Sequence, residues 1–150
     1  MALTLYGEFI RLVEQLQAHK IPYVVIGGLA VSYHSHARAT EDIDFLVLTP
    51  DIERIRGLMR SLSYLIETPP WTFQNSGLTV RRFSRFEGEE HMIVDIMTSA
   101  EPKYVSMVER AIVADTAAGP VRFACKDDLI FLKRQRNSPQ DQVDIADLQK

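Results

Sequence analysis

The stretch Val24-Val25-Ile26-Gly27-Gly28 is followed, after thirteen residues, by Asp42-Ile43-Asp44-Phe45-Leu46-Val47. The first run has the apolar pattern of a buried strand and ends in a glycine pair. The second run predicts another buried strand that begins with two aspartates in alternation. Successive side chains of a strand point to opposite faces, so the two aspartates share one face. Two carboxylates beside a backbone that a ligand can approach closely favour metal-assisted phosphate chemistry. An enzyme that acts on a nucleotide is therefore the first hypothesis.

Composition and charge limit the class of protein. The chain has 150 residues and a formal net charge of −3, which suits one domain with a real core and argues against broad non-specific binding to nucleic acid. Cys125 is the single cysteine, which excludes an intrachain disulfide and fits a reducing compartment. No apolar run reaches the ~20 residues needed to cross a bilayer, and the N-terminus lacks the layout of a signal peptide. We therefore expect a cytoplasmic location and no membrane partner.

Hydrophobic periodicity and turn residues predict an alternation of helices and strands. Helices are expected over residues 5–18, 28–33, 51–62, 102–108 and 126–136, with Asp51 as an N-cap, and a further helix from residue 140 in which the chain ends. Strands are expected over residues 23–27, 42–48, 78–85, 91–98, 112–115 and 121–124. The middle two and the last two of these strands form hairpins, and residues 68–77 are expected to be a loop.

A third carboxylate lies in Met92-Ile93-Val94-Asp95-Ile96-Met97. A lone acid in an apolar strand is costly unless it is paired or bound to a metal ion. If Asp95 lies on a strand beside Asp42 and Asp44, each carboxylate pair at ~4 Å repels by about 4 kcal/mol at an effective dielectric of 20. Such a cluster needs protons or cations at neutral pH, and hard divalent cations suit oxygen ligands best. Two such ions would clamp the attacking and leaving oxygens of an in-line displacement.

The glycine pair stands where a strand turns into a helix. Free backbone N–H groups at a helix N-terminus bind anions, and the missing side chains let phosphates approach. Gly27 and Gly28 are alternatively an ordinary turn. The pair combined with the spaced aspartates and the downstream acid favours a phosphate site.

These residues resemble the nucleotidyltransferase superfamily that includes DNA polymerase β. Its pattern is a hydrophobic residue with Gly-Gly or Gly-Ser, a gap, an acid-hydrophobic-acid triplet and a third acid on a later strand. Residues 38–45 look closest to bacterial minimal nucleotidyltransferases, which include the toxins of abortive-infection type toxin–antitoxin systems. Residues 127–133 and 141–145 are similar to the C-terminal lysine and Asp-x-x-Asp segment of that group. The resemblance covers about residues 20–148.

The resemblance implies a fold, a cofactor and a set of site residues. The implied fold is α/β (α+β), a short mixed sheet flanked by helices. Residues 1–150 form a single domain, and residues 126–150 are approximately the start of a C-terminal helical element. The implied cofactor is Mg²⁺, with two ions bound, or alternatively Mn²⁺. The implied site residues are Asp42, Asp44 and Asp95 for metal binding and catalysis, Gly27, Gly28, Ser32 and Lys133 for phosphate contact, and Arg38 and Thr40 for support of the site or substrate contact. Thr40 alternatively caps the start of the strand.

The leading hypothesis is an enzyme that moves a nucleoside monophosphate from a nucleoside triphosphate to an acceptor hydroxyl. The acceptor classes are RNA such as a tRNA end, protein, and small molecules such as aminoglycoside-like antibiotics. An antitoxin or a second copy of the chain is the expected protein partner. One alternative is a catalytically silent module that acts through a partner protein, and another is a structural cation site.

Several other residues leave two interpretations open. His34 and His36 are polar loop residues or zinc ligands. Trp71 and Phe73 stack on a base or anchor their loop. The basic cluster at residues 81–85 contacts an RNA backbone or balances the glutamates of the hairpin.

Overall fold

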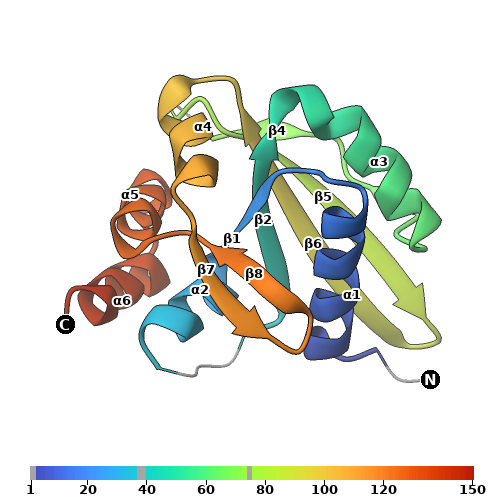
Figure 1. Ribbon diagram of the computed structural model, residues 1–150, viewed down its shortest axis with the longest axis horizontal. Coiled ribbons are helices and arrows are strands. Elements are labelled where there is room, and N and C mark those ends of the chain that lie inside the picture. The colour runs from blue at the N-terminus through green and yellow to red at the C-terminus, as the bar shows by residue number, and fades with distance from the viewer. Residues whose placement is uncertain (1–2, 37–39, 74–75) are drawn as a thin grey trace.

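The computed structural model describes residues 3–36, 40–73 and 76–150, and Figure 1 shows its ribbon. The helices are α1 (Leu5–Ala18), α2 (Gly27–His34), α3 (Ile52–Ser61), α4 (Pro102–Glu109), α5 (Lys126–Arg136) and α6 (Pro139–Leu148), with a 3₁₀ turn, η1 (Thr49–Asp51), before α3. The strands are β1 (Tyr23–Ile26), β2 (Asp42–Leu48), β3 (Ile66–Glu67), β4 (Trp71–Thr72), β5 (Thr79–Glu87), β6 (Glu90–Ser99), β7 (Ile112–Thr116) and β8 (Gly119–Phe123). No helix within these ranges has both the length and the apolar character to span a membrane.

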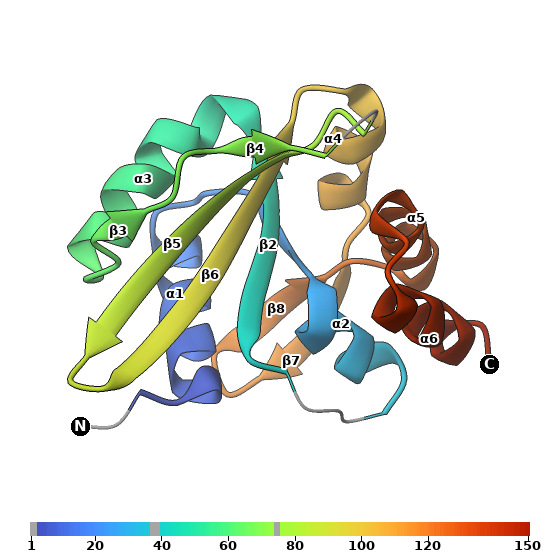
Figure 2. The same ribbon diagram turned by 180° about the vertical axis from the view of Figure 1, so that it is seen from behind.

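The strands of the described residues form one mixed sheet. Its order is β3-β5-β6-β2-β1-β8-β7, and β4 pairs with β5 beside this path. The central strand β2 runs parallel to β6 and antiparallel to β1. Figures 1 and 2 show α1 and α3 on one face of the sheet, with α5 and α6 together at the far side of the molecule from the turn between β5 and β6. The predicted α/β fold, a mixed sheet flanked by helices, is confirmed.

The apolar face of β2 explains which way its aspartates point. Ile43 and Phe45 alternate with the acids and are buried. Phe45 stacks on Phe9 of α1 with ring centroids 6.3 Å apart and meets the ring of Tyr23 edge-on at 5.8 Å. Because side chains alternate along a strand, packing this face against α1 fixes the acids on the opposite face. The hydrophobic core therefore positions the carboxylates of β2.

The structure corrects several predicted element boundaries. The expected loop over residues 68–77 contains β4, and β3 precedes it; both are two-residue strands held by β5. The last helix ends at Leu148 and is capped by Gln149, so the chain does not end inside it. Asp51 takes the N-cap position of α3, but its side chain makes no capping bond and instead accepts a hydrogen bond from Arg54 at 3.2 Å. A strand of two residues is too short for its side-chain periodicity to be recognised, which explains why β3 and β4 were not predicted.

Candidate active site

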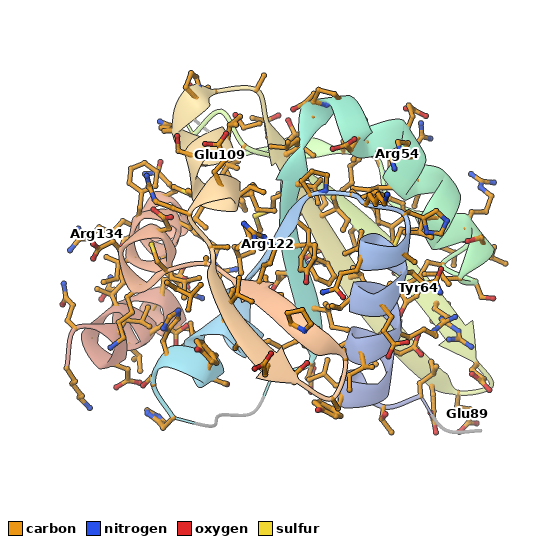
Figure 3. All side chains as sticks on the ribbon, in the orientation of Figure 1. Arg54, Tyr64, Glu89, Glu109, Arg122 and Arg134 are labelled. Carbon is orange, nitrogen blue, oxygen red and sulfur yellow. The ribbon has the colours of Figure 1, made fainter. Side chains whose placement is uncertain are left out.

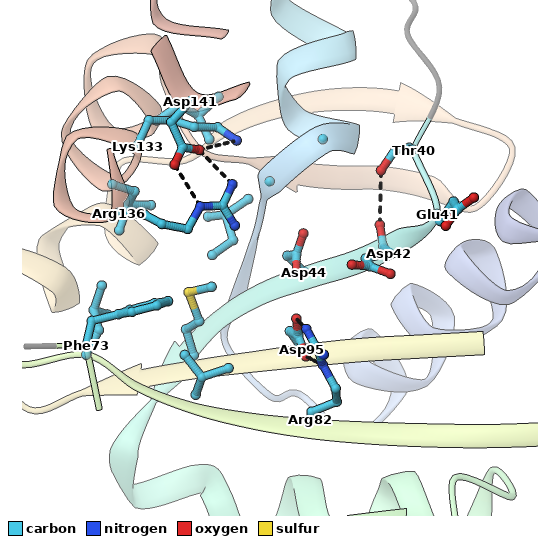
Figure 4. Close-up of a pocket in the computed structure, with 18 of the residues that line it drawn as sticks. Thr40, Glu41, Asp42, Asp44, Phe73, Arg82, Asp95, Lys133, Arg136 and Asp141 are labelled. Carbon is cyan, nitrogen blue, oxygen red and sulfur yellow. Dashed lines mark hydrogen bonds and ion pairs between the residues drawn. The ribbon is translucent and has the colours of Figure 1, made fainter. Parts of the chain in front are cut away.

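The three predicted acids lie on two neighbouring strands. β2 and β6 pair in register, with Asp44 directly opposite Asp95 and Asp42 opposite Ile93. Directly opposed residues of neighbouring strands point to the same face of the sheet. Figure 4 shows Asp42, Asp44 and Asp95 gathered in one part of the pocket. The structure therefore brings together the two acids of the triplet and the lone acid found fifty residues downstream.

Gly27 lies directly against this acid group. It begins α2 with a φ of +74°, and a Cβ added to it would come 2.1 Å from Oδ2 of Asp44. Glycine tolerates positive φ without steric cost, and any other residue here would displace the carboxylate. The neighbouring ladder pairs Ile26 with Asp44. The glycine therefore allows the helix N-terminus and the acid to lie side by side, which is the arrangement that a phosphate and its counter-ions need.

A cavity of about 560 Å³ opens over the acids. Of the strands that line it, β2, β5 and β6 contribute charged side chains, and α5 supplies both charged and apolar residues. The lining residues are Ile26, Gly27, Gly28, Thr40, Glu41, Asp42, Asp44, Trp71, Phe73, Leu78, Val80, Arg82, Asp95, Met97, Leu129, Leu132, Lys133, Arg136 and Asp141. The cavity is thus charged around the acids and apolar along the side formed by β4, β5 and α5.

Most predicted site residues that the structure describes line this cavity, and Ser32 does not. Gly27, Gly28, Thr40 and Lys133 line it together with the three acids. Ser32 is absent from the lining, and its buried hydroxyl has no hydrogen-bond partner within the described residues. Arg38 lies outside the described residues. Thr40 donates a hydrogen bond to the backbone carbonyl of Asp42 at 3.4 Å, which agrees with the alternative that it caps the start of the strand.

The carboxylates of β2 perturb one another. Burial and the charges of Asp95 and Asp42 raise the pKa of Asp44 to about 7, while Lys133 and Arg136 lower it. Burial and the charge of Asp95 also raise the pKa of Asp42, while Arg82 lowers it. Both shifts have the same physical origin, since desolvation and like charges each disfavour the ionised form. At neutral pH, additional positive charge would therefore stabilise the ionised form of these carboxylates.

Arg82 is a site residue that the sequence analysis did not single out. It stands directly opposite Asp95 on the β5–β6 hairpin. Its Nε and NH2 atoms donate to the two oxygens of Asp95 at 2.9 and 3.0 Å, and this pairing raises the pKa of Arg82. The signal was present in the sequence, because the correct hairpin register alone places this arginine across from the acid.

The other arginines of the basic cluster serve elsewhere. Arg81 pairs with Glu67 at 3.3 Å, and Arg85 pairs with Glu8 at 2.9 Å and with Glu87 at 3.1 Å. The expected balance of the hairpin glutamates describes only the contact with Glu87, because Glu67 belongs to β3 and Glu8 to α1.

Lys133 lines the cavity but is already ion-paired. Its Nζ lies 3.0 Å from Asp144 and 3.6 Å from Asp141, and only 7% of the side chain is exposed. Arg136, one helical turn further along α5, donates to both oxygens of Asp141 at 2.7 and 2.6 Å. Figure 4 shows Arg136 and Asp141 together at one end of the pocket. These four residues form what we call the α5–α6 charge cluster.

The helix that carries the two acids of this cluster is fixed by its first residues. Ser138 accepts a hydrogen bond from the backbone of Asp141 at 3.1 Å, and the carboxylate of Asp141 accepts one from the backbone of Ser138 at 2.9 Å. This reciprocal capping box stabilises the start of α6. Asp141 therefore both caps the start of α6 and pairs with Arg136.

The donor atoms at the acid group suit a hard divalent cation, but their arrangement does not yet form a metal site. All three acids offer carboxylate oxygens, the ligands that Mg²⁺ prefers. Both oxygens of Asp95, however, are bonded to Arg82. Within residues 3–36, 40–73 and 76–150, no group of three or more His, Cys, Asp or Glu side chains is placed to hold a metal ion. The predicted Mg²⁺ or Mn²⁺ ions therefore stay a prediction, as does the zinc interpretation of His36 and of His34, which is the last residue of α2 and not a loop residue.

Solved structures share this fold. TM1012, a candidate nucleotidyltransferase from Thermotoga maritima, is 14% identical and aligns with a TM-score of 0.63 over 95% of this chain and 92% of its own. An antigenic nucleotidyltransferase-like protein from Paracoccidioides brasiliensis is 17% identical, with a TM-score of 0.59 over 95% of this chain and 72% of its own. ANT(2″)-Ia, solved in complex with adenylyl-2″-tobramycin, is 13% identical, with a TM-score of 0.55 over 94% and 87%. At these identities the likeness establishes the fold alone.

The sequence itself carries the family assignment. No protein of curated function matches the chain. Residues 3–149 match the family described as nucleotidyltransferase of unknown function, DUF6036. That match spans nearly the whole chain and agrees with the resemblance carried by the glycine pair and the three acids. The chain belongs to this nucleotidyltransferase family.

Proposed function

We propose that the protein transfers a nucleoside monophosphate from a nucleoside triphosphate to an acceptor hydroxyl, with Mg²⁺ or Mn²⁺ as cofactor. One observation carries the proposal: Asp44 lies opposite Asp95 and beside the glycine-initiated N-terminus of α2, within a single cavity. The family match and the fold of its neighbours support transfer chemistry in general. The single cysteine supports a cytoplasmic location.

We assign each of the site residues a separate role in the proposed reaction. The backbone N–H groups of Gly27 and Gly28 bind the phosphates of the donor, where the helix dipole favours negative charge. Asp42 and Asp44 would hold the divalent cations, which supply positive charge to the phosphates when bound. Asp95 would complete the cation site and help to activate the acceptor hydroxyl by taking its proton. The acceptor oxygen forms a bond to the α-phosphorus, the bond to the bridging oxygen breaks, and pyrophosphate leaves with that electron pair.

The charged side chains of the cavity indicate which class of acceptor it suits. Among the residues that the structure describes, the cations that line it are Arg82, Lys133 and Arg136, and each is bonded to a carboxylate. A polyanionic acceptor such as RNA gains little from cations that are already paired. We therefore place small-molecule and protein acceptors ahead of RNA, and ANT(2″)-Ia, whose complex holds an adenylylated aminoglycoside, makes the small-molecule class the first to test. A toxin–antitoxin role, with an antitoxin or a second copy as partner, belongs to the same proposal.

Incorporation of label tests the reaction. Purified protein is incubated with α-labelled ATP, GTP, CTP or UTP, Mg²⁺ and either a cell extract or an aminoglycoside set. We expect wild type to label an acceptor, and Asp42→Asn/Asp44→Asn to lose at least about 100-fold in rate because the cation ligands are gone. Asp115→Asn is the matched control, since Asp115 is exposed on β7 far along the sheet from the acids. Equal labelling by wild type and the double variant would overturn the proposal.

A second function is favoured by the ion pairs themselves. Arg82 occupies Asp95, and Lys133 is buried against Asp144, which suits a nucleotidyltransferase fold that binds a nucleotide or a partner protein without turnover. In that case the protein would bind triphosphate, no acceptor would be labelled, and a stable partner would be captured. If Mg²⁺ alone raised the melting temperature and triphosphate added nothing, the structural cation site would account for the acids.

A further inference from the structure

The pair of Arg82 and Asp95 joins a solvent-accessible cation to a buried acid. Asp95 is 6% exposed, whereas the side chain of Arg82 is 38% exposed. Two hydrogen bonds of 2.9 and 3.0 Å give the pair a bidentate geometry, the strongest form of arginine–carboxylate contact. The guanidinium is therefore held from the cavity side, where it can leave without unfolding the sheet, while the acid is fixed by β6.

The place that the guanidinium holds is the one a divalent cation needs. Asp42 and Asp44 lie on the neighbouring strand, so a cation bound by all three acids must reach an oxygen of Asp95. Both oxygens of Asp95 are bonded to Arg82, and within the part of the chain that the structure describes no group of three or more His, Cys, Asp or Glu side chains is placed to hold a metal ion. The guanidinium offsets part of the mutual repulsion of the carboxylates, which a cation would offset more fully.

While bonded to Asp95, the guanidinium already lies over an aromatic ring. Its central carbon is 5.6 Å from the centroid of the Trp71 ring. An arginine over an aromatic face gains cation–π attraction without hydrogen bonds. Trp71 also lines the cavity. A small rotation of the arginine away from Asp95 would therefore keep it over the ring and open the acid.

We propose that Arg82 is a resident counter-ion that competes with the divalent cation for Asp95, and that metal binding breaks its hydrogen bonds to the carboxylate while the guanidinium stays over the ring of Trp71. This inference rests on the proposed metal-dependent function. It assigns Arg82 as a positioning residue that sets how tightly the site takes a cation. It also assigns Trp71 a role in the site, where base stacking and loop anchoring were the earlier interpretations.

Binding of Mn²⁺, followed by electron paramagnetic resonance on the full chain, tests the competition without requiring turnover. Arg82→Gln removes the competing charge, and we expect it to bind Mn²⁺ at least about tenfold more tightly than wild type. Arg82→Lys keeps a charge but loses the bidentate fork, so an intermediate affinity is expected. Arg81→Gln is the matched control on the same strand, because Arg81 pairs with Glu67 and does not line the cavity; its affinity should equal that of wild type.

Trp71→Leu tests whether the ring retains the guanidinium after it leaves Asp95. Without the ring, the displaced arginine has a poorer place to go, so Mn²⁺ should bind about two- to fivefold more weakly. In the double variant Arg82→Gln/Trp71→Leu this loss should disappear. Circular dichroism of each variant shows that the fold is retained, and Arg82→Lys keeps the test decisive if Arg82→Gln does not fold.

The outcomes separate the inference from the proposed function. Unchanged or weaker Mn²⁺ binding in Arg82→Gln and Arg82→Lys, with wild type binding normally, would overturn the competition and leave the metal-dependent function standing. No Mn²⁺ binding by any variant, even with triphosphate present, would overturn both. Tighter binding in Arg82→Gln without labelling of any acceptor would support the competition and count against the transfer reaction.

Discussion

Two groups of buried charges face each other across the cavity, and they differ in balance. The α5–α6 charge cluster holds two cations, Lys133 and Arg136, and two acids, Asp141 and Asp144, paired within 3.0 Å. The second, which we call the acid-rich group, holds Asp42, Asp44 and Asp95 on β2 and β6 and, among the described residues, one cation paired with them, Arg82 on β5. A balanced buried network can be complete without a ligand, whereas an excess of carboxylates calls for cations. We therefore infer that the α5–α6 charge cluster holds the two helices together and that the acid-rich group binds cations.

The largest effect is expected from breaking the balanced cluster. Asp144→Asn removes the nearest carboxylate of the buried Lys133, so we expect the free energy of unfolding to fall by about 3 kcal/mol. The measurement is urea unfolding followed by circular dichroism at pH 7. The double variant Lys133→Met/Asp144→Asn, which leaves no unpaired charge, should recover part of the loss. A single variant as stable as wild type would mean that this cluster does not hold the helices.

The same substitution in the acid-rich group should act in the opposite direction. Asp44→Asn removes one of three neighbouring carboxylates and is expected to raise the free energy of unfolding by about 1–2 kcal/mol in metal-free buffer. Urea unfolding in the presence of a chelator measures it. Asp42→Asn should give a smaller increase, because the pKa of Asp42 is also raised but Arg82 lies close enough to oppose the shift. A loss of stability in Asp44→Asn would show that its charge is already compensated.

The sequence predicted the acid-rich group well because its signals are local. Alternation placed Asp42 and Asp44 on one face, and the apolar residues around Asp95 marked a central strand, so their meeting required only that the two strands be neighbours. Gly27 was predicted at the turn from strand to helix. Its tight contact with Asp44 depends on the positive φ and on the register of β1 against β2, which a single sequence does not reveal.

The pairs that neutralise charge were harder to predict because each joins two different helices or strands. Arg82 meets Asp95 only through the register of β5 and β6. Lys133 was expected to contact a phosphate, and nothing in its own helix indicates that α6 would bring Asp144 to within 3.0 Å. The capping residue Ser138 carried a local signal, since serine before a proline with an acid three residues on predicts a helix start. Hydrophobic patterns in the sequence were sufficient to predict the fold, whereas the ion pairs depend on how the helices and strands pack against one another.

The smallest effect concerns pH and sharpens the same comparison. Burial alone would raise the pKa of Asp141, but hydrogen bonds from Arg136 and Ser138 hold it well below the ordinary value. The unfolded chain therefore binds this proton more readily than the folded one. The stabilisation is complete above the ordinary pKa of an aspartate and is lost as the pH falls through the lower pKa of the folded state.

Unfolding measured at pH 7 and pH 3 tests this linkage. Wild type should lose about 1 kcal/mol more on acidification than Asp141→Asn, which has no proton to bind at this position. Ser138→Ala, which removes one of the hydrogen bonds to the carboxylate, should lose an intermediate amount while keeping the acid. Asp115→Asn, an exposed control, should follow wild type. If Asp141→Asn loses as much stability as wild type, the carboxylate is not held in its ionised form by the cluster, and the balance attributed to α5 and α6 fails with it.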